Sequence, residues 1–118
     1  MIGIDIVLLS HFDHVINSPG GNTFIKRVFS ESELAQCENK SDKMKSLAGR
    51  YAIKEAVIKA SKGELNISDL KAIQIRQDIS GYLDVVVDRN DISCCKYDVS
   101  MSHDGDYIVG IAVKFKFD

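Results

Sequence analysis

The first residues of the chain alternate between large apolar side chains and smaller or polar ones. Three isoleucines share one face of a strand predicted over residues 2–7, and Asp5 lies on the opposite face, because successive side chains of a strand point to opposite sides. An acid within an otherwise apolar strand lowers stability unless water, a hydrogen bond or a cation satisfies it. Asp5 is therefore either a solvated residue at a sheet edge or a cation ligand.

Two longer alternating stretches in the second half of the chain predict β-hairpins. Residues 72–87 alternate on both sides of a turn-forming cluster at residues 78–81, and residues 97–117 alternate around a second turn at residues 103–106. Aspartate, serine and glycine favour such turns because their side chains hydrogen-bond locally or permit unusual backbone angles. We therefore expect two antiparallel strand pairs in this half of the chain.

Helical patterns predominate between the first strand and the hairpins. Residues 8–17 are compatible with a helix before a Pro-Gly turn, and Ser30 with the acid three residues later has the spacing of a capping box that opens a short helix through about Cys37. Only Gly49 interrupts residues 41–62, so about 22 residues form a helix of about 33 Å. The order of strand, helices and hairpins predicts an α+β fold with a largely antiparallel sheet packed on the long helix.

The long helix carries apolar residues on two faces. The first face holds Met44, Leu47, Ala48, Tyr51 and Ile58, and the second holds Ile53, Val57 and Ala60. Glu55 falls in the middle of the first face, where Lys59 is its expected partner in an i,i+4 salt bridge. Arg50 and Lys54 flank this acid, and solvated side chains are expected for both. Apolar coverage on two sides of one helix favours a subunit interface in so small a domain.

The composition is that of an ordinary globular domain. The 118 residues are 45% hydrophobic and carry 15 basic against 17 acidic side chains, so we expect one domain over residues 1–118 and no nucleic-acid partner. No apolar run approaches the about 20 residues of a membrane span, and the N-terminus lacks a basic leader, which favours a cytoplasmic protein without a membrane partner. Cys37, Cys94 and Cys95 lack CxxC spacing, so neither zinc nor disulfides are expected.

Two clusters carry candidate chemistry. Asp5 on the strand and Glu55 on the helix supply the oxygen ligands that Mg²⁺ uses together with water and substrate phosphates, provided that the fold brings them together. Residues 100–105 end a strand with two hydroxyls on one face and His103 on the other. These groups either satisfy local backbone atoms or hold a phosphate, and the pattern alone leaves both interpretations open.

Three segments carry motifs in a recognisable order. They are Ile2-Gly3-Ile4-Asp5-Ile6-Val7, then Ala48-Gly49-Arg50-Tyr51-Ala52-Ile53-Lys54-Glu55-Ala56 with Lys59-Ala60, and finally Ser100-Met101-Ser102-His103-Asp104. Together they resemble the small bacterial 4′-phosphopantetheinyl transferases of the holo-acyl-carrier-protein synthase type, and Phe29-Ser30-Glu31-Ser32-Glu33-Leu34 is similar to the family's segment between the first two motifs. Each motif is weak alone, but the ordered set covers nearly the whole chain.

The resemblance implies the α+β fold of these transferases and an enzyme that moves 4′-phosphopantetheine from coenzyme A to a serine of an apo acyl carrier protein. Adenosine 3′,5′-bisphosphate would be released, and three identical chains would form a ring with active sites between neighbours. The carrier would be acidic and would serve fatty-acid or secondary-metabolite synthesis. A non-catalytic module that binds coenzyme A or the carrier, and a metal-dependent diphosphate hydrolase, are the alternatives.

The resemblance also implies roles for individual residues. Asp5 and Glu55 would hold Mg²⁺, Glu55 and Lys59 would act in catalysis, and either Glu55 or a metal-bound water would take the serine proton. Coenzyme A is expected at Arg50, Lys59, Lys62, Ser102 and His103, and the carrier at His11, Lys26 and Arg27. The chain departs from the family in its turn Ser61–Glu64, which is usually glycine-rich, and in His11, where another basic residue is usual.

Overall fold

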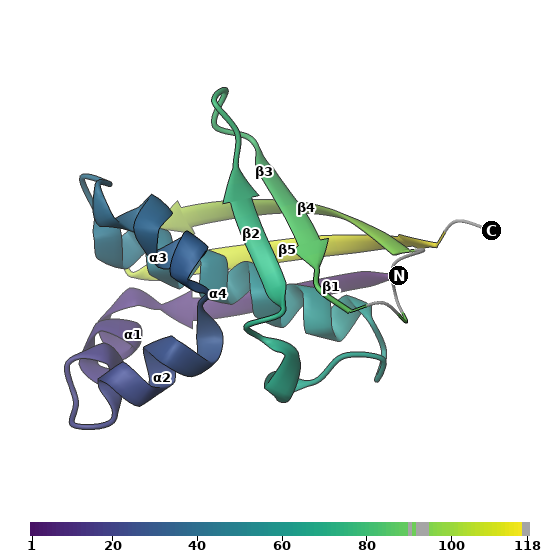
Figure 1. Cartoon of the computed structure of the whole chain (residues 1–118). Helices are drawn as coiled ribbons and strands as arrows, with labels where there is room; N and C mark the ends of the chain where they lie inside the picture. The colour runs from purple at the N-terminus through teal and green to yellow at the C-terminus, as the bar shows by residue number, and fades with distance from the viewer. Residues whose placement is uncertain (90, 92–94, 117–118) are drawn as a thin grey trace.

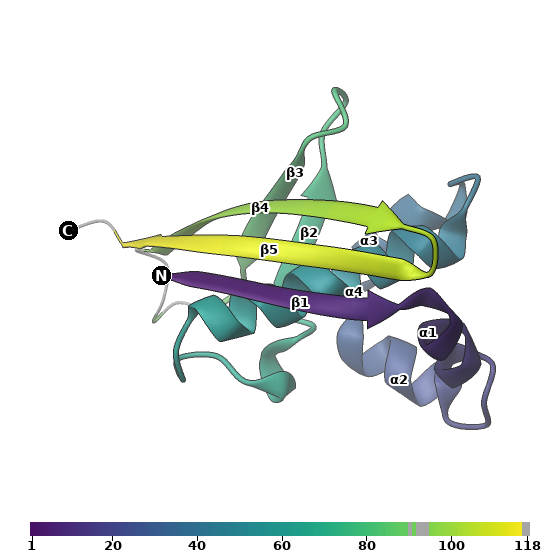
Figure 2. The ribbon, with the colours of Figure 1, turned by 180° about the vertical axis from the view of Figure 1, so that it is seen from behind.

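One long helix and two antiparallel sheets form the framework of the fold. The computed structural model describes residues 1–89, 91 and 95–116. Its elements are, in chain order, β1 (Ile2–Leu8), α1 (Leu9–Ile16), α2 (Gly21–Val28), α3 (Glu31–Glu38), α4 (Lys43–Ala60), the short 3₁₀ helix η1 (Ile67–Asp69), β2 (Ile73–Gln77), β3 (Leu83–Val87), β4 (Cys95–Asp104) and β5 (Tyr107–Lys116). One sheet has the strand order β1-β5-β4, and the hairpin β2-β3 forms the other. Helix α4 lies along the three-stranded sheet, and β2 crosses α4 on the side that faces away from this sheet (Figures 1 and 2).

This architecture confirms the predicted α+β fold, with an antiparallel sheet packed on one long helix. Helix α4 begins at Lys43 because the Asp42 side chain caps it by accepting a hydrogen bond from the Lys45 amide at 3.0 Å. The capping box predicted at the start of α3 is present, since Ser30 and Glu33 exchange side-chain-to-backbone hydrogen bonds. Unlike the prediction of one sheet, the hairpin β2-β3 pairs separately from the other strands. The predicted end of the last strand at residue 117 lies outside the described residues.

Helix α2 has no clear signal in the sequence, because it follows a Pro-Gly turn directly and starts with a glycine. Its stability comes from packing rather than from local propensity. Phe24 of α2 contacts the rings of Phe12 and Tyr51, with centroids 5.9 and 5.5 Å away, and Val28 is buried. Helices α1, α2 and α4 therefore share one aromatic contact that only the tertiary fold creates.

Strand β1 presents its isoleucines to the outside. Ile2, Ile4 and Ile6 are 64%, 59% and 60% exposed, whereas the opposite face, with Gly3 and Asp5, lies against α4. A Cβ on Gly3 would come within 2.0 Å of the Ala56 carbonyl oxygen of α4, so only glycine permits this close approach of strand and helix. The prediction that Asp5 lies opposite the isoleucines is therefore confirmed, and Asp5 shares the inner face of β1 with the buried Val7.

Both apolar faces of α4 are covered within the same chain. One face packs in a core cluster with α1, α2 and α3, and the other packs in a second cluster with β2, β4 and β5. The two-sided pattern of this helix is therefore explained without a partner, so it does not support the subunit interface expected from the sequence. The apolar side chains that the described chain leaves exposed include Ile2, Ile4 and Ile6 of β1.

Two further sequence expectations concern the membrane and the cysteines. Within the part of the chain that the structure describes, no helix is both long enough and apolar enough to cross a membrane. Cys37 is fully buried, and burial raises the pKa of its thiol above the ordinary value. Cys94 lies outside the described residues.

Candidate active site

Asp5 and Glu55 line the same cavity. Strand β1 places Asp5 against α4, and the cavity of about 390 Å³ between them is also lined by Tyr51 of α4 and by His11 of α1. Asp5 and Glu55, which are 50 positions apart in the sequence, thus face the same cavity because β1 lies along α4. The condition that the sequence left open, that the two carboxylates come together, is met by this packing.

Lys59, one turn after Glu55 on α4, contacts Asp5 of this pair. Its ammonium donates hydrogen bonds to Asp5 Oδ1 at 3.0 Å and to the Ile4 carbonyl oxygen at 3.1 Å. A pair with Glu55 along the helix was expected, but Lys59 pairs across to β1, where two acceptors are available. Its side chain remains 54% exposed, so this ion pair is a weak one.

The electrostatics of Glu55 favour a cation nearby. Burial is the main cause that raises the pKa of this carboxyl, and the negative charge of Asp5 raises it further, while a hydrogen bond from Tyr51 and the charge of Lys59 act in the opposite direction. Burial and the neighbouring Glu55 raise the pKa of Tyr51 to about 12, so the phenol stays a hydrogen-bond donor at neutral pH. The charge of Asp5 thus disfavours the ionised form of Glu55, and a divalent cation shared by the two carboxylates would offset this repulsion.

The donor set fits Mg²⁺ better than a metal held by protein side chains alone. In the described ranges, no group of three or more His, Cys, Asp or Glu side chains is arranged to hold a metal. A pair of carboxylates that leaves the remaining positions to water or substrate oxygens is what Mg²⁺ commonly uses. Asp5 and Glu55 are the residues that could hold such an ion.

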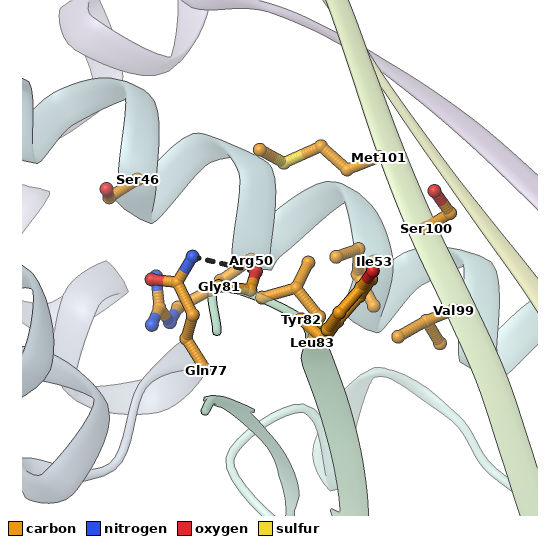
Figure 3. A pocket seen from close by; sticks show the side chains of 10 residues that line it. All are labelled: Ser46, Arg50, Ile53, Gln77, Gly81, Tyr82, Leu83, Val99, Ser100 and Met101. Carbon is orange, nitrogen blue, oxygen red and sulfur yellow. Dashed lines mark hydrogen bonds between the residues drawn. The ribbon is translucent and has the colours of Figure 1, made fainter. Parts of the chain in front are cut away.

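Arg50 lies in a different cavity. It lines a space of about 280 Å³ between α4, the hairpin β2-β3 and β4 (Figure 3), and it is only 4% exposed, so the solvated side chain expected from the sequence was wrong. One terminal nitrogen, Nη2, donates to Gln36 Oε1 at 3.0 Å. Of the buried side-chain nitrogens and oxygens in the described residues, only Nε of Arg50 lacks a hydrogen-bond partner. A buried cationic group with a free donor is suited to an anion.

The other residues expected at coenzyme A lie at the ends of α4 and β4. Ser102 and His103 are exposed at the end of β4. His103 lies two residues after Met101 and therefore on the same face of the strand, and Met101 lines the Arg50 cavity. Lys62 is exposed just beyond α4 and has a positive φ of 45°. Neither the carboxylate cavity nor the Arg50 cavity is lined by any of these three residues.

The turn Ser61–Glu64, where the sequence departs from the family, is held by side chains. The hydroxyls of Ser61 and Tyr97 lie 2.6 Å apart in the core. Lys114 of β5 donates to Glu64 Oε2 at 2.8 Å, and Arg89 donates to the Glu64 carbonyl oxygen at 2.9 Å. These contacts give the turn a defined shape without a glycine-rich sequence.

Of the residues expected to dock the carrier, one lines the carboxylate cavity and another lines its neighbour. His11 is exposed on α1 and lines that cavity with Asp5 and Glu55. Lys26 and Arg27 are exposed on α2, and Arg27 lines a neighbouring cavity of about 840 Å³ that also reaches Glu55. The structure thus groups His11 and Arg27 around the same acid.

A buried ion pair beside Glu55 had no signal in the sequence. Lys54 was expected to be solvated, but it is fully buried, and its ammonium contacts Glu33 Oε1 and the Val28 carbonyl oxygen at 2.6 Å and the Leu70 carbonyl oxygen at 2.8 Å. Glu33 Oε2 accepts from the amide of Ile75 in β2 at 3.0 Å. This pair therefore joins α4 to α2, α3 and β2 next to the candidate metal ligand.

The role of Tyr51 as a hydrogen-bond partner of Glu55 was not predicted from the sequence either. The i,i+4 spacing of the two residues on the helix is a signal that could have indicated it.

Comparisons with known proteins match the chain to one family. Residues 1–112 match the family model described as the 4′-phosphopantetheinyl transferase superfamily. The chain is 32% identical over 118 residues to a holo-[acyl-carrier-protein] synthase of Clostridium kluyveri, covering 95% of this chain and 87% of that protein. It is 33% identical over 115 residues to the synthase of Chlorobium chlorochromatii, covering 95% of this chain and 97% of that protein.

Solved structures of the same kind have the same fold. The Helicobacter pylori holo-[acyl-carrier-protein] synthase in complex with coenzyme A has a TM-score of 0.81 and 26% identity, with 98% of this chain and 100% of that chain covered. The synthase of Neisseria meningitidis has a TM-score of 0.82 and 27% identity, with 98% and 97% covered. The chain therefore belongs to the 4′-phosphopantetheinyl transferase superfamily, and within it to the holo-[acyl-carrier-protein] synthases.

Proposed function

We propose that the protein transfers 4′-phosphopantetheine from coenzyme A to a serine of an apo acyl carrier protein in a Mg²⁺-dependent reaction. The observation that carries the proposal is the pair of carboxylates, Asp5 and Glu55, that faces one cavity beside Lys59. The serine oxygen would bond to the phosphorus next to pantetheine, and the bond from that phosphorus to the bridging oxygen would break. Adenosine 3′,5′-bisphosphate would leave with that oxygen, and the serine proton would pass to a base.

Each residue near the reacting phosphates has a separate task in this proposal. Asp5 and Glu55 would hold Mg²⁺, which when bound neutralises charge on the diphosphate. Lys59, whose exposed ammonium already lies beside Asp5, would offset the charge of the leaving phosphate. Either Glu55 or a metal-bound water would take the serine proton.

The apolar outer face of the three-stranded sheet supports assembly of several copies. On that face, Ile2, Ile4 and Ile6 of β1 pair with Val113, Ile111 and Val109 of β5. The neighbouring positions on β4 are polar and exposed, so the apolar patch has a polar border, as a protein interface often has. We propose a homotrimer in which β1 and β5 of neighbouring copies pack together.

An active site between two copies would combine the carboxylate cavity of one copy with the Arg50 cavity of its neighbour. The carboxylate cavity and the Arg50 cavity share none of their lining residues. In a trimer, one copy would supply Asp5 and Glu55, and its neighbour would supply Arg50, Ser102 and His103 for the nucleotide phosphate. Lys62, in its side-chain-anchored turn, would add a further phosphate contact.

The carrier would dock on α1 and α2. His11, Lys26 and Arg27 are exposed there, near the cavities that reach Glu55, and an acidic carrier surface would be attracted to them. One domain over residues 1–118, a cytoplasmic location and a role in fatty-acid biosynthesis stay predictions that agree with this activity.

The test is the intact mass of an apo acyl carrier protein after incubation with the enzyme, coenzyme A and Mg²⁺. We expect a gain of one phosphopantetheine that EDTA abolishes and that Asp5→Asn reduces by about 10²-fold or more. Asp84→Asn, at an exposed acid of β3, is the matched control and should leave the rate unchanged. Hydrolysis of coenzyme A without the carrier would instead indicate a diphosphate hydrolase, and binding without turnover would indicate a non-catalytic module.

A further inference from the structure

An aromatic ring is exposed at the wall of the Arg50 cavity. Tyr82, just before β3, is 75% exposed although it lines the same space as Arg50. Figure 3 shows that residues from three parts of the fold line this cavity, with Arg50 on α4, Tyr82 in the turn of the hairpin, and Ser100 on β4. The cavity is thus lined by the largely buried guanidinium residue Arg50, by a tyrosine that is mostly exposed, and by the serines Ser46 and Ser100.

The turn that carries Tyr82 is held in one shape. Asp78 Oδ1 accepts from the amide of Tyr82 at 3.0 Å, and the Tyr82 carbonyl oxygen accepts from the amide of Asp78 at 2.9 Å. Gln77 Nε2 donates to the Gly81 carbonyl oxygen at 3.1 Å (Figure 3), and Gly81 has a φ of 90° that favours glycine. The ring of Tyr82 is therefore attached to a preorganised backbone, which lowers the entropy that a stacking ligand would cost.

A phosphate group and a planar base are the two chemical groups that this combination suits. Arginine donates to phosphate oxygens in a planar, charge-assisted geometry. An exposed aromatic ring stacks on nucleobases without depending on hydrogen-bond pattern. A phosphorylated nucleoside carries both groups at a short separation, so it fits a cavity with Arg50 at its floor and Tyr82 at its wall.

We propose that Tyr82 is a specificity-determining residue that stacks on the adenine of coenzyme A while Arg50 holds the phosphate of the same nucleotide. The inference rests on the proposed function, and it assigns the adenosine end of the donor to the hairpin β2-β3. In the trimer, Tyr82 would act on a coenzyme A whose diphosphate lies at Asp5 and Glu55 of the neighbouring copy. No contact of Tyr82 with those carboxylates is required.

The test compares the binding of three ligands by calorimetry. Coenzyme A has both the base and the 3′-phosphate, dephospho-coenzyme A keeps only the base, and 4′-phosphopantetheine has neither. We expect Tyr82→Ala to bind coenzyme A and dephospho-coenzyme A about 5- to 50-fold more weakly than the wild type, with 4′-phosphopantetheine unchanged. Tyr82→Phe should bind all three as the wild type does.

Ile79→Ala is the matched control, because Ile79 is exposed in the same turn but does not line the cavity. It should leave all three affinities unchanged. Unchanged binding of coenzyme A to Tyr82→Ala overturns the role of Tyr82 alone, as does an equal loss for 4′-phosphopantetheine. Absence of coenzyme A binding to the wild type overturns the proposed function and the role of Tyr82 together.

Discussion

The buried pair Lys54–Glu33 offers the sharpest test of the packing that supports the site. Their side chains are 0% and 1% exposed, and the ammonium and carboxylate lie 2.6 Å apart. Replacing Lys54 by Met leaves the Glu33 carboxylate buried without a cation and removes the donor from the carbonyl groups of Val28 and Leu70. Breaking one side of such a pair costs about 3–5 kcal/mol, a large part of the about 5–15 kcal/mol that stabilises a typical domain.

The second single variant and the double variant separate charge from packing. Glu33→Gln leaves the Lys54 ammonium without a counter-ion, so a similar loss of about 3–5 kcal/mol is expected. The double variant Lys54→Met/Glu33→Gln contains no unpaired buried charge, and the introduced amide oxygen would still accept from a backbone amide. We therefore expect the double variant to cost about 2–3 kcal/mol less than the sum of the single variants.

The assay is urea unfolding followed by circular dichroism at one fixed protomer concentration, because an oligomer's stability depends on concentration. The control is the surface pair Arg76–Asp84, whose side chains are 53% and 57% exposed, and Arg76→Met should cost under about 1 kcal/mol. Additive costs in the double variant, or a Lys54→Met loss as small as that of the control, would refute the reasoning.

Three other predictions concern assembly, the shared site and the carrier. Ile4→Lys puts a charge on the apolar face of β1 and should convert the proposed trimer to monomers in analytical ultracentrifugation; a wild type that is not trimeric, or a variant that stays trimeric, would contradict the proposed interface. Asp5→Asn and His103→Ala should each be inactive alone, but after unfolding and refolding together in equal amounts they should regain about a quarter of wild-type activity, because sites between copies then include intact ones. No recovery would mean that each copy holds a whole site. The double variant Lys26→Glu/Arg27→Glu should raise the KM for the carrier several-fold and leave the KM for coenzyme A unchanged. The wild-type KM for the carrier should also rise with salt concentration. A KM for the carrier that changes neither in the double variant nor with salt would exclude electrostatic docking by α2.

The sequence by itself was sufficient for features that depend on neighbours along the chain. Alternation predicted β1 and both hairpins, and the spacing of Ser30 and Glu33 predicted the capping box of α3 that the structure confirms. The ordered motifs were sufficient to indicate the family. These signals are local because a strand repeats every two residues and a helix about every 3.6, so the pattern can be read within one element.

Only the tertiary structure decided which distant groups meet. It directed Lys59 to Asp5 instead of Glu55, buried Lys54 against Glu33, and turned the isoleucines of β1 outward while Asp5 faced α4. Periodicity divides an element into two faces, but it carries no information about which face the rest of the chain will cover. The partner of a charged side chain is likewise set by the packing of elements far apart in sequence, because the energy of a buried charge depends on the groups that surround it in space.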